Sequence, residues 1–329
     1  MKILVTGATG CLGGVVAAKL AALGHSVTGT GRDLAKGAAL ATSGVTFAPA
    51  ELTNQVLMRA LVLQYDVVIH CGGLSSPWGK DIDFQRSNVD GTRILVEAAL
   101  EGGQRLVFVS SPSIYFDFSD RIAIADNDPP APHPVNAYAA SKLAAEGIVT
   151  HAAANGLDGV ILRPRAIFGA TDTALLPRLL RAAARGYLPL IDNGNAAIDL
   201  TYVDNAADAL IAAALRPQRF AGQAYNISNG EPITVRDLLQ RISAGLGLRV
   251  RFLHLPFALA YRVAAILETL AKLRPSRPEP MLTRYGVGVL ARSQTLSIAG
   301  AQRDLGFKPA VSLDEGLRRT LSAWKARHA

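Results

Sequence analysis

Short apolar runs alternate with amphipathic stretches through the first half of the chain. The runs are nearly continuous in Val, Ile and Leu, as expected of strands buried on both faces of a sheet. Between them, Gly13–Gly24 and Gly91–Gly103 have helical spacing and end at glycine. The pattern predicts strands at Lys2–Gly7, Ser26–Gly31, Asp66–Cys71, Arg105–Ser111 and Gly159–Pro164.

The order of these elements predicts the fold class. Strands that alternate with helices form a parallel sheet with right-handed crossovers. We therefore expect an α/β protein with a Rossmann-type, doubly wound parallel sheet. The alternation becomes irregular after Pro164, which indicates a second, smaller domain. We assign residues 1–165, with about 199–228, to a nucleotide-binding domain, and residues 166–198 and 229–329 to a substrate-binding domain.

Composition limits the classes of function. Of 329 residues, 50% are hydrophobic and 18% are charged, which is typical of a globular chain and excludes disorder. Two distant cysteines, Cys11 and Cys71, make no disulfide framework, so we expect a reducing, cytoplasmic compartment. The first apolar run is too short for a signal peptide, and no stretch reaches the roughly 18 apolar residues of a membrane span.

The net charge of +8 is unevenly distributed. From Arg241 to the end there are 15 Lys/Arg and 5 Asp/Glu, so the remainder of the chain is slightly acidic. This region is either a solvated basic surface or a contact for an anionic partner: a carboxylate substrate, a membrane surface or another enzyme. Nucleic acid is not expected, because no arginine-rich or aromatic-interleaved motif accompanies the charge.

A glycine-rich loop follows the first predicted strand and opens the first predicted helix. Gly7, Gly10 and Gly13 form the pattern G-x-x-G-x-x-G. Such glycines let the backbone approach a pyrophosphate, which the N–H groups of the helix N-terminus attract. Turns alone would also explain the glycines, but their place between strand and helix favours a dinucleotide site. Cys11 has no neighbouring base, so we interpret it as a small loop residue.

Tyr138 and Lys142 are four residues apart in a stretch of helical spacing, so they lie on one face of a helix. An ammonium beside a phenol lowers the phenol pKa from about 10. Such a tyrosine can protonate a carbonyl during its reduction, or act as the base in reverse. Ser111, at the end of a strand, would hydrogen-bond the same substrate oxygen; the alternative is a serine that caps a turn.

These motifs, with IHCGG, SNVDGT, LRPRAIFG and LGFKPAVSLDEGL, resemble the extended short-chain dehydrogenase/reductases along nearly the whole chain. The resemblance implies a catalytic set of Ser111, Tyr138 and Lys142, with Asn88 organising the site, and no metal. Glu51 stands where the family usually has an aspartate. Together, motif and resemblance predict cofactor contacts from Gly7, Thr9, Gly10, Cys11, Leu12, Gly13, Arg32, Glu51, Leu52, Gly72, Gly73, Ser110, Tyr138, Lys142, Pro164 and Ile167.

Within this family the chain is similar to the 3β-hydroxysteroid dehydrogenase-like branch. Ile198 replaces an arginine of the nucleotide-sugar epimerases, and the stretches Ala260–Leu270 and Arg277–Tyr285 are similar to the 2-alkyl-3-oxoalkanoate reductases. The resemblance implies a homodimeric oxidoreductase that interconverts a ketone and a secondary alcohol on a hydrophobic substrate, either a 2-alkyl-3-oxoalkanoate or a steroid-like compound. The alternatives are a nucleotide-sugar epimerase/dehydratase and a non-catalytic dinucleotide sensor, although such sensors typically lose the tyrosine or lysine.

The tip of the second predicted strand, SVTGTGRD, should select the cofactor. An acidic residue there would bind both adenosine ribose hydroxyls and favour NAD(H). Gly31 instead leaves room, and Arg32 can bind a 2′-phosphate, whereas Asp33 comes late and is expected to start the next helix. We therefore expect a preference for NADP(H), with NAD(H) as the alternative and a merely solvated Arg32 as the simpler interpretation.

The apolar segment Pro256–Leu273 allows three interpretations. It could line or cover a hydrophobic substrate pocket. It could be an ordinary packing helix. It could also be an interfacial helix that places Arg262 and Lys272 toward lipid headgroups.

Overall fold

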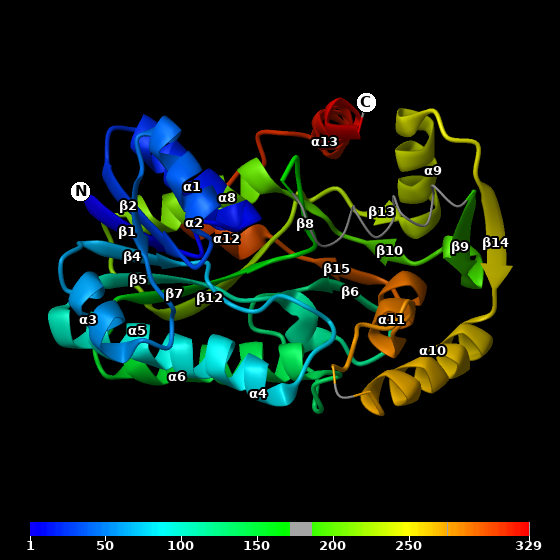
Figure 1. The fold of residues 1–329 in the computed structure, drawn as a ribbon, viewed down its shortest axis with the longest axis horizontal. Coiled ribbons are helices and arrows are strands. Elements are labelled where there is room, and N and C mark those ends of the chain that lie inside the picture. Colours follow the sequence, from blue (N-terminus) through cyan, green and yellow to red (C-terminus); the bar gives the residue numbers. More distant parts are fainter. Residues whose placement is uncertain (172–185, 275, 329) are drawn as a thin grey trace.

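A seven-stranded, fully parallel sheet forms the centre of the computed structural model, which describes residues 1–171, 186–274 and 276–328. Its strands are β1 (Lys2–Thr6), β2 (Ser26–Gly31), β3 (Thr46–Pro49), β4 (Val67–His70), β5 (Arg105–Val109), β7 (Gly159–Pro164) and β12 (Ala221–Ile227). Their order is β12-β7-β5-β4-β1-β2-β3, so the chain winds outward in both directions from β1 and β4 (Figure 1). The predicted doubly wound α/β fold is confirmed.

Two strands of this sheet were not predicted. β3 is a short edge strand that carries Thr and Pro, and none of its residues is fully buried. β12 begins with the polar and exposed stretch Ala221–Gln223 and is buried only from Tyr225 onward. Both lack the continuous apolar run that identifies a strand buried on both faces.

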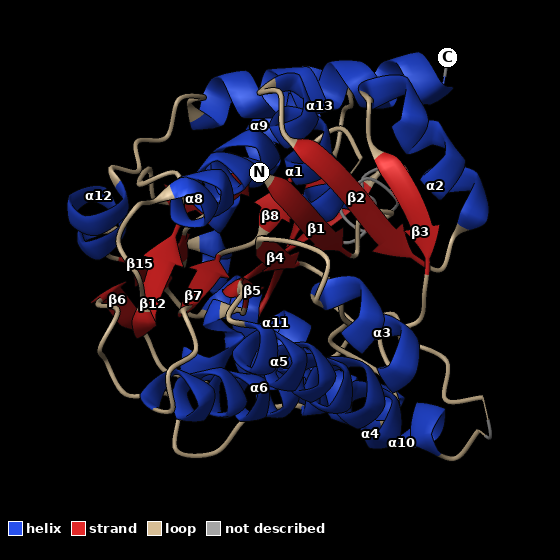
Figure 2. Ribbon diagram, turned by 90° about the vertical axis from the view of Figure 1, so that its left-hand side faces the viewer, coloured by secondary structure: helices blue, strands red, loops and turns tan. Residues whose placement is uncertain are grey.

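Helices cover both faces of the sheet, because successive side chains of a strand point to opposite faces. One layer holds α1 (Cys11–Ala22) and α8 (Val203–Leu215), and the other holds α3 (Gln55–Val62), α5 (Gly91–Gly102) and α6 (Ala137–Ala154). Ile3 and Val5 of β1 join the core with α1 and α8, whereas Leu4 joins the core with the other layer. Figure 2 shows the sheet between these layers.

Smaller elements extend from the carboxyl edge of the sheet. The strands are β6 (Arg121–Ile124), β8 (Ile167–Phe168), β9 (Tyr187–Ile191), β10 (Ala197–Ile198), β11 (Thr201–Tyr202), β13 (Ile233–Thr234), β14 (Arg251–Leu255) and β15 (Gln294–Leu296). They form a four-stranded sheet, β13-β10-β15-β6, and the pairs β11-β8 and β14-β9. The remaining helices are α2 (Leu34–Ala39), α4 (Asp81–Phe84), α9 (Val235–Leu246), α10 (Phe257–Lys272), α11 (Arg284–Ala291), α12 (Ala299–Leu305) and α13 (Leu313–His328). Residues 172–185 of the predicted substrate-binding domain lie outside the described residues.

A buried ion pair joins α6 to the central sheet. Arg163 of β7 donates two hydrogen bonds to the Glu146 carboxylate, at 2.9 Å from Nε and 2.6 Å from Nη2. Arg163 also donates to the hydroxyl of Tyr115 and to the Asp126 carbonyl, so all of its polar groups point to partners. Breaking a buried pair is strongly destabilising, because one charge then lacks compensation in a low dielectric.

We expect Glu146→Gln to lower the free energy of unfolding by about 3 kcal/mol, because it leaves the Arg163 guanidinium buried without its counter-ion. Urea-induced unfolding followed by circular dichroism measures the loss. Glu101→Gln is the matched control, since Glu101 also pairs with an arginine, Arg59, but both side chains are 51% exposed. Its loss should stay below about 1 kcal/mol. Equal losses in the two variants would contradict the role given to the buried pair.

Candidate active site

The glycine loop between β1 and α1 is in backbone contact with the end of β4. Gly7 has a positive φ of 68°, and a Cβ there would lie 2.7 Å from the Cα and N of Gly72. A Cβ on Gly13 would lie 2.4 Å from the Gly7 carbonyl oxygen. The N-terminus of α1 at Gly10 has no side-chain cap and no acidic residue in its first turn. This geometry fits a dinucleotide pyrophosphate, which needs a bare, electropositive helix start.

The tip of β2 lies beside this loop. The Thr9 side chain fills the space next to Gly31, where a Cβ would come 2.6 Å from its hydroxyl oxygen. Asp33 caps α2, as predicted, because its carboxylate accepts the Lys36 N–H at 3.0 Å. Arg32 is exposed between the two. Asp33 is thus engaged in capping α2, whereas Arg32 takes no part in the cap.

The other predicted cofactor residues are spread along the carboxyl edge of the sheet. Leu52 reaches the glycine at the end of β4, where a Cβ on Gly72 would lie 2.9 Å from its Cδ1. Cys11 and Leu12 begin α1, and Glu51 is exposed just after β3. Beyond the middle of the sheet lie Ser110 after β5, Pro164 at the end of β7, and Ile167 in the separate strand pair β8-β11. The Ser110 hydroxyl is buried without a hydrogen-bond partner.

Asn88 shapes the loop after β4 through its side-chain amide. It lies in a π-helical segment, Gln85–Asp90, that links α4 to α5. Its Oδ1 accepts the Leu74 N–H at 2.6 Å, and its Nδ2 donates to the Leu74 carbonyl at 3.0 Å and to Ser141 Oγ at 2.9 Å. The extra residue of a π turn re-aims side chains at functional sites. The geometry gives Asn88 an organising position between the loop and α6.

A second set of polar contacts supports the same loop from below. The ring of His70 is hydrogen-bonded to Thr6 Oγ1 at 2.7 Å and to Thr92 Oγ1 at 3.0 Å. Burial lowers the pKa of His70 to about 3, with a smaller contribution from the Lys142 charge, so the ring is neutral. Burial also raises the pKa of the Cys71 thiol to about 12. These groups hold the strand ends together and carry no charge at neutral pH.

Tyr138 and Ser111 come together at the carboxyl edge of β5. Tyr138, in the first turn of α6, is hydrogen-bonded to Ser111 and to Ser75. Burial raises the pKa of the Tyr138 phenol, and these hydrogen bonds oppose the rise. The predicted lowering of this pKa by Lys142 is therefore wrong for the protein without ligand, because desolvation dominates. Ser111 also caps a short 3₁₀ turn by accepting the Ser113 N–H at 3.2 Å, so the capping interpretation of this serine is confirmed, and its hydrogen bond to a substrate oxygen stays a prediction.

The Lys142 ammonium is buried one turn beyond Tyr138. It donates to the Val109 carbonyl at 2.8 Å and lies 4.9 Å from the centroid of the Phe108 ring. Burial lowers the pKa of Lys142 to about 8, and the Glu146 carboxylate opposes this shift. The Lys142 ammonium therefore lies at the carboxyl end of β5. It is also close to Gly73, because a Cβ built on that glycine would lie 3.9 Å from Lys142 Nζ.

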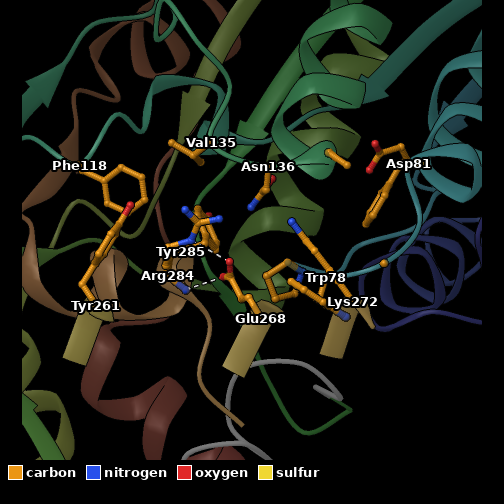
Figure 3. Close-up of a pocket in the computed structure, with 14 residues that line it drawn as sticks. Trp78, Asp81, Phe118, Val135, Asn136, Tyr261, Glu268, Lys272, Arg284 and Tyr285 are labelled. Atoms are coloured by element: carbon orange, nitrogen blue, oxygen red, sulfur yellow. Dashed lines mark hydrogen bonds and ion pairs between the residues drawn. The ribbon is translucent and has the colours of Figure 1, made fainter. Parts of the chain in front are cut away.

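A pocket of about 190 Å³ opens beside these residues. Figure 3 shows side chains from distant parts of the chain around it, among them Trp78, Asn136 and Tyr285. The α10 side chains that line it are Tyr261, Glu268 and Lys272. The segment Pro256–Leu273 thus lines a pocket, as the first interpretation expected, but through aromatic and charged side chains rather than aliphatic ones.

Sequence reasoning missed a buried cation at this site. Arg165 follows β7 and is only 5% exposed, and its Nε has no hydrogen-bond partner. It is hydrogen-bonded to Tyr285, which lines the pocket and lies near Tyr138. Asp199 lies close enough to interact with Arg165, but its Oδ2 is held by the Leu296 N–H at 2.7 Å. The second arginine of LRPRAIFG was the available signal, since arginine is rarely buried without a partner.

Comparisons with known proteins agree with this geometry. The sequence model of the NAD dependent epimerase/dehydratase family matches residues 3–228. The chain is 38% identical to the uncharacterized protein YbjS of Escherichia coli (strain K12), over 100% of this chain and 98% of that protein. It is 37% identical to the 2-alkyl-3-oxoalkanoate reductase of Stenotrophomonas maltophilia (strain K279a), over 97% of this chain and 98% of that protein.

A solved structure supports the same relationship. MoeE5 in complex with UDP-glucose and NAD superposes with a TM-score of 0.79 at 25% identity, with full coverage of both chains. Relatives of this chain are named reductases and dehydrogenases, and the family is NAD-dependent. The chain belongs to the NAD dependent epimerase/dehydratase family of extended short-chain dehydrogenase/reductases and is an oxidoreductase of that family.

Proposed function

We propose that the protein reduces the ketone of a hydrophobic 2-alkyl-3-oxo acid to a secondary alcohol with NADPH. The observation that carries this proposal is the hydrogen-bonded pair of Tyr138 and Ser111, next to the buried Lys142 and a pocket of about 190 Å³. The similarity to a 2-alkyl-3-oxoalkanoate reductase over nearly the full length of both chains supports the substrate class.

When bound, NADPH supplies the hydride that the carbonyl carbon receives. The glycine loop and the N-terminus of α1 would hold its pyrophosphate, and Lys142 would bind its nicotinamide ribose. Tyr138 holds the proton that the carbonyl oxygen needs, and its raised pKa keeps the phenol protonated before reduction. Ser111 donates a hydrogen bond to the same oxygen, and a preorganised donor of this kind lowers the barrier by about 3 kcal/mol.

We expect Tyr138→Phe to reduce turnover by a factor of about 10² to 10⁴, because the proton donor is lost. Its Kd for NADPH should stay close to that of the wild type, as measured by cofactor fluorescence. Tyr65→Phe, which removes a partly buried phenol remote from the site, is the matched control and should keep full turnover. Normal turnover in Tyr138→Phe would sink the assignment.

The preference for NADPH rests on Arg32. It is exposed at the tip of β2, and Asp33 is engaged in capping α2. The room expected beside Gly31 is taken by the Thr9 side chain, so the preference rests on the exposed guanidinium alone. An arginine can bind a phosphate through two parallel hydrogen bonds. The first charged residue after β2 is therefore Arg32, and not an acidic residue that would bind both ribose hydroxyls and select NADH.

We expect Arg32→Ala to raise the KM for NADPH about tenfold or more and to leave the KM for NADH nearly unchanged, because only NADPH carries the 2′-phosphate. Steady-state kinetics with both cofactors measure the ratio. Arg93→Ala, an exposed arginine of α5, is the control and should leave the ratio intact. Equal use of NADPH and NADH by the wild type would refute the preference.

Arg165 supports an acid rather than a neutral steroid as substrate. A buried guanidinium with an unpaired Nε has a hydrogen-bond donor to offer, and a carboxylate is its preferred partner. Its contact with Tyr285 places it behind the pocket wall nearest Tyr138. A 3-oxo acid has its carboxylate two bonds from the ketone carbon, so one group can be held while the other faces Tyr138.

We expect Arg165→Met to raise the KM for a 2-alkyl-3-oxo acid about ten- to a hundredfold, because a charge-assisted hydrogen bond is lost. The KM for the methyl ester of the same compound should change little, and so should the Kd for NADPH. Arg165→Lys keeps the charge and should retain part of the selectivity for the acid. An unchanged preference for acid over ester in Arg165→Met would show that the carboxylate is bound elsewhere.

Nucleotide-sugar epimerisation is the second candidate, because the similar MoeE5 structure holds UDP-glucose and NAD. An epimerase keeps its cofactor through the cycle, whereas a ketone reductase consumes it. Net consumption of NADPH by a ketone separates the two. No consumption with any ketone, together with epimerisation of a sugar nucleotide, would favour the second candidate.

A further inference from the structure

The helix α10 carries a continuous apolar stripe on its outer side. The stripe consists of Leu259 (53% exposed), Val263 (42%), Ile266 (61%), Leu270 (54%) and Leu273 (76%). Their spacing of three and four residues places all five on one face of the helix. Figure 1 shows α10 at the periphery of the molecule, next to β14 and α11. Five large aliphatic side chains in one exposed row mark an interaction surface.

The inner side of α10 has the opposite character. It packs through the small residues Ala260, Ala264 and Ala271 and through Glu268, which is bound to Arg284 at 2.7 Å. A helix that only served the core would place its large aliphatic residues inward. In α10 the large aliphatic residues point outward, so packing within the chain does not account for them.

Basic side chains border the stripe. Arg262 lies on one flank of the stripe, three residues after Leu259. Arg274 lies on the other flank, four residues after Leu270 and just beyond the end of the helix. Arg277 adds a further exposed cation just beyond the helix. Lys272 is also exposed but lies on the opposite side of α10, over the Trp78 ring, so it does not border the stripe as the interfacial interpretation expected. The one carboxylate between Arg262 and Arg277 is Glu268, and it is buried. The exposed side of α10 is therefore apolar in the middle and positive at its rim.

We propose that this face of α10 docks on an anionic lipid surface. An interfacial helix has this composition, with aliphatic side chains that enter the acyl boundary and cations that meet the headgroups. A second copy of the chain fits less well, because a symmetric pairing would bring the same basic rims together. In the described part of the chain no helix is long and apolar enough to cross a membrane, so α10 lies on the surface.

Docking also places the substrate pocket beside the lipid. The opposite side of α10 lines that pocket through Tyr261, Glu268 and Lys272. A second hollow opens at the end of the helix; of the described residues that line it, five are charged and two, Ile82 and Leu273, are apolar. The docked face and the pocket therefore lie on opposite sides of a single helix.

Flotation of the full-length protein with vesicles tests the proposal. Vesicles of phosphatidylcholine with about 30% phosphatidylglycerol should carry the wild type upward at low salt, and pure phosphatidylcholine should carry far less. Ile266→Ser with Leu270→Ser should reduce the bound fraction about tenfold or more, and Arg262→Gln with Arg274→Gln should reduce it on anionic vesicles. Val56→Ser, an exposed apolar residue of α3, is the control and should bind as the wild type does.

Melting temperature and turnover on a short, water-soluble ketone verify that each variant is folded, since none of these residues lines the substrate pocket. Equal flotation of wild type and the Ile266→Ser, Leu270→Ser variant would overturn the proposal. So would no flotation of the wild type on anionic vesicles. Sedimentation gives the competing outcome: a dimer of the wild type that this variant converts to a monomer, without lipid binding, would assign the stripe to contact between copies.

Discussion

Burial of one ammonium group, that of Lys142, is the constraint on which the site depends. A buried charge is costly unless hydrogen bonds and opposite charges compensate it. Here the Val109 carbonyl accepts a hydrogen bond from the ammonium, and the Phe108 ring lies next to the charge. Glu146 lies one turn further along α6. Glu146 is held in turn by Arg163. The compensation of one charge thus runs from α6 into β7 and fixes the helix that carries Tyr138.

The loop after β4 completes the site from the other side, and it is built almost entirely from neutral contacts. Asn88 binds the backbone of Leu74 in both directions, and the neutral ring of His70 joins Thr6 to Thr92. With the bond from Asn88 to Ser141, these contacts connect two strand ends, those of β1 and β4, with the helices α5 and α6 without adding charge. The field of Lys142 and Arg165 therefore acts on the pocket with little competition from ionised groups in this loop.

Local patterns predicted the parts of the structure that depend on neighbouring residues. Apolar runs predicted the central strands, and the spacing of glycines predicted the loop after β1. The four-residue spacing of Tyr138 and Lys142 predicted that they share one face of a helix. The rest depends on residues far apart in the chain. The contact of Arg165 with Tyr285 joins positions on different domains of the prediction, and the raised pKa of Tyr138 follows from burial. The sequence of Pro256–Leu273 left three interpretations of an apolar segment open, and only the packed structure shows that its aliphatic side chains lie on the outer face of α10.

The contact between Gly7 and Gly72 has a consequence for how such a chain can change over time. A side chain on Gly7 would meet backbone atoms, which, unlike the end of a flexible side chain, cannot rotate away. Any larger residue must therefore push apart the ends of β1 and β4, the two strands at which the direction of winding reverses. Gly72 is confined as well, by Leu52 and Thr6. A substitution at either glycine alone is therefore disfavoured. Chains related by evolution are expected to keep both glycines or to lose the close contact between the ends of β1 and β4.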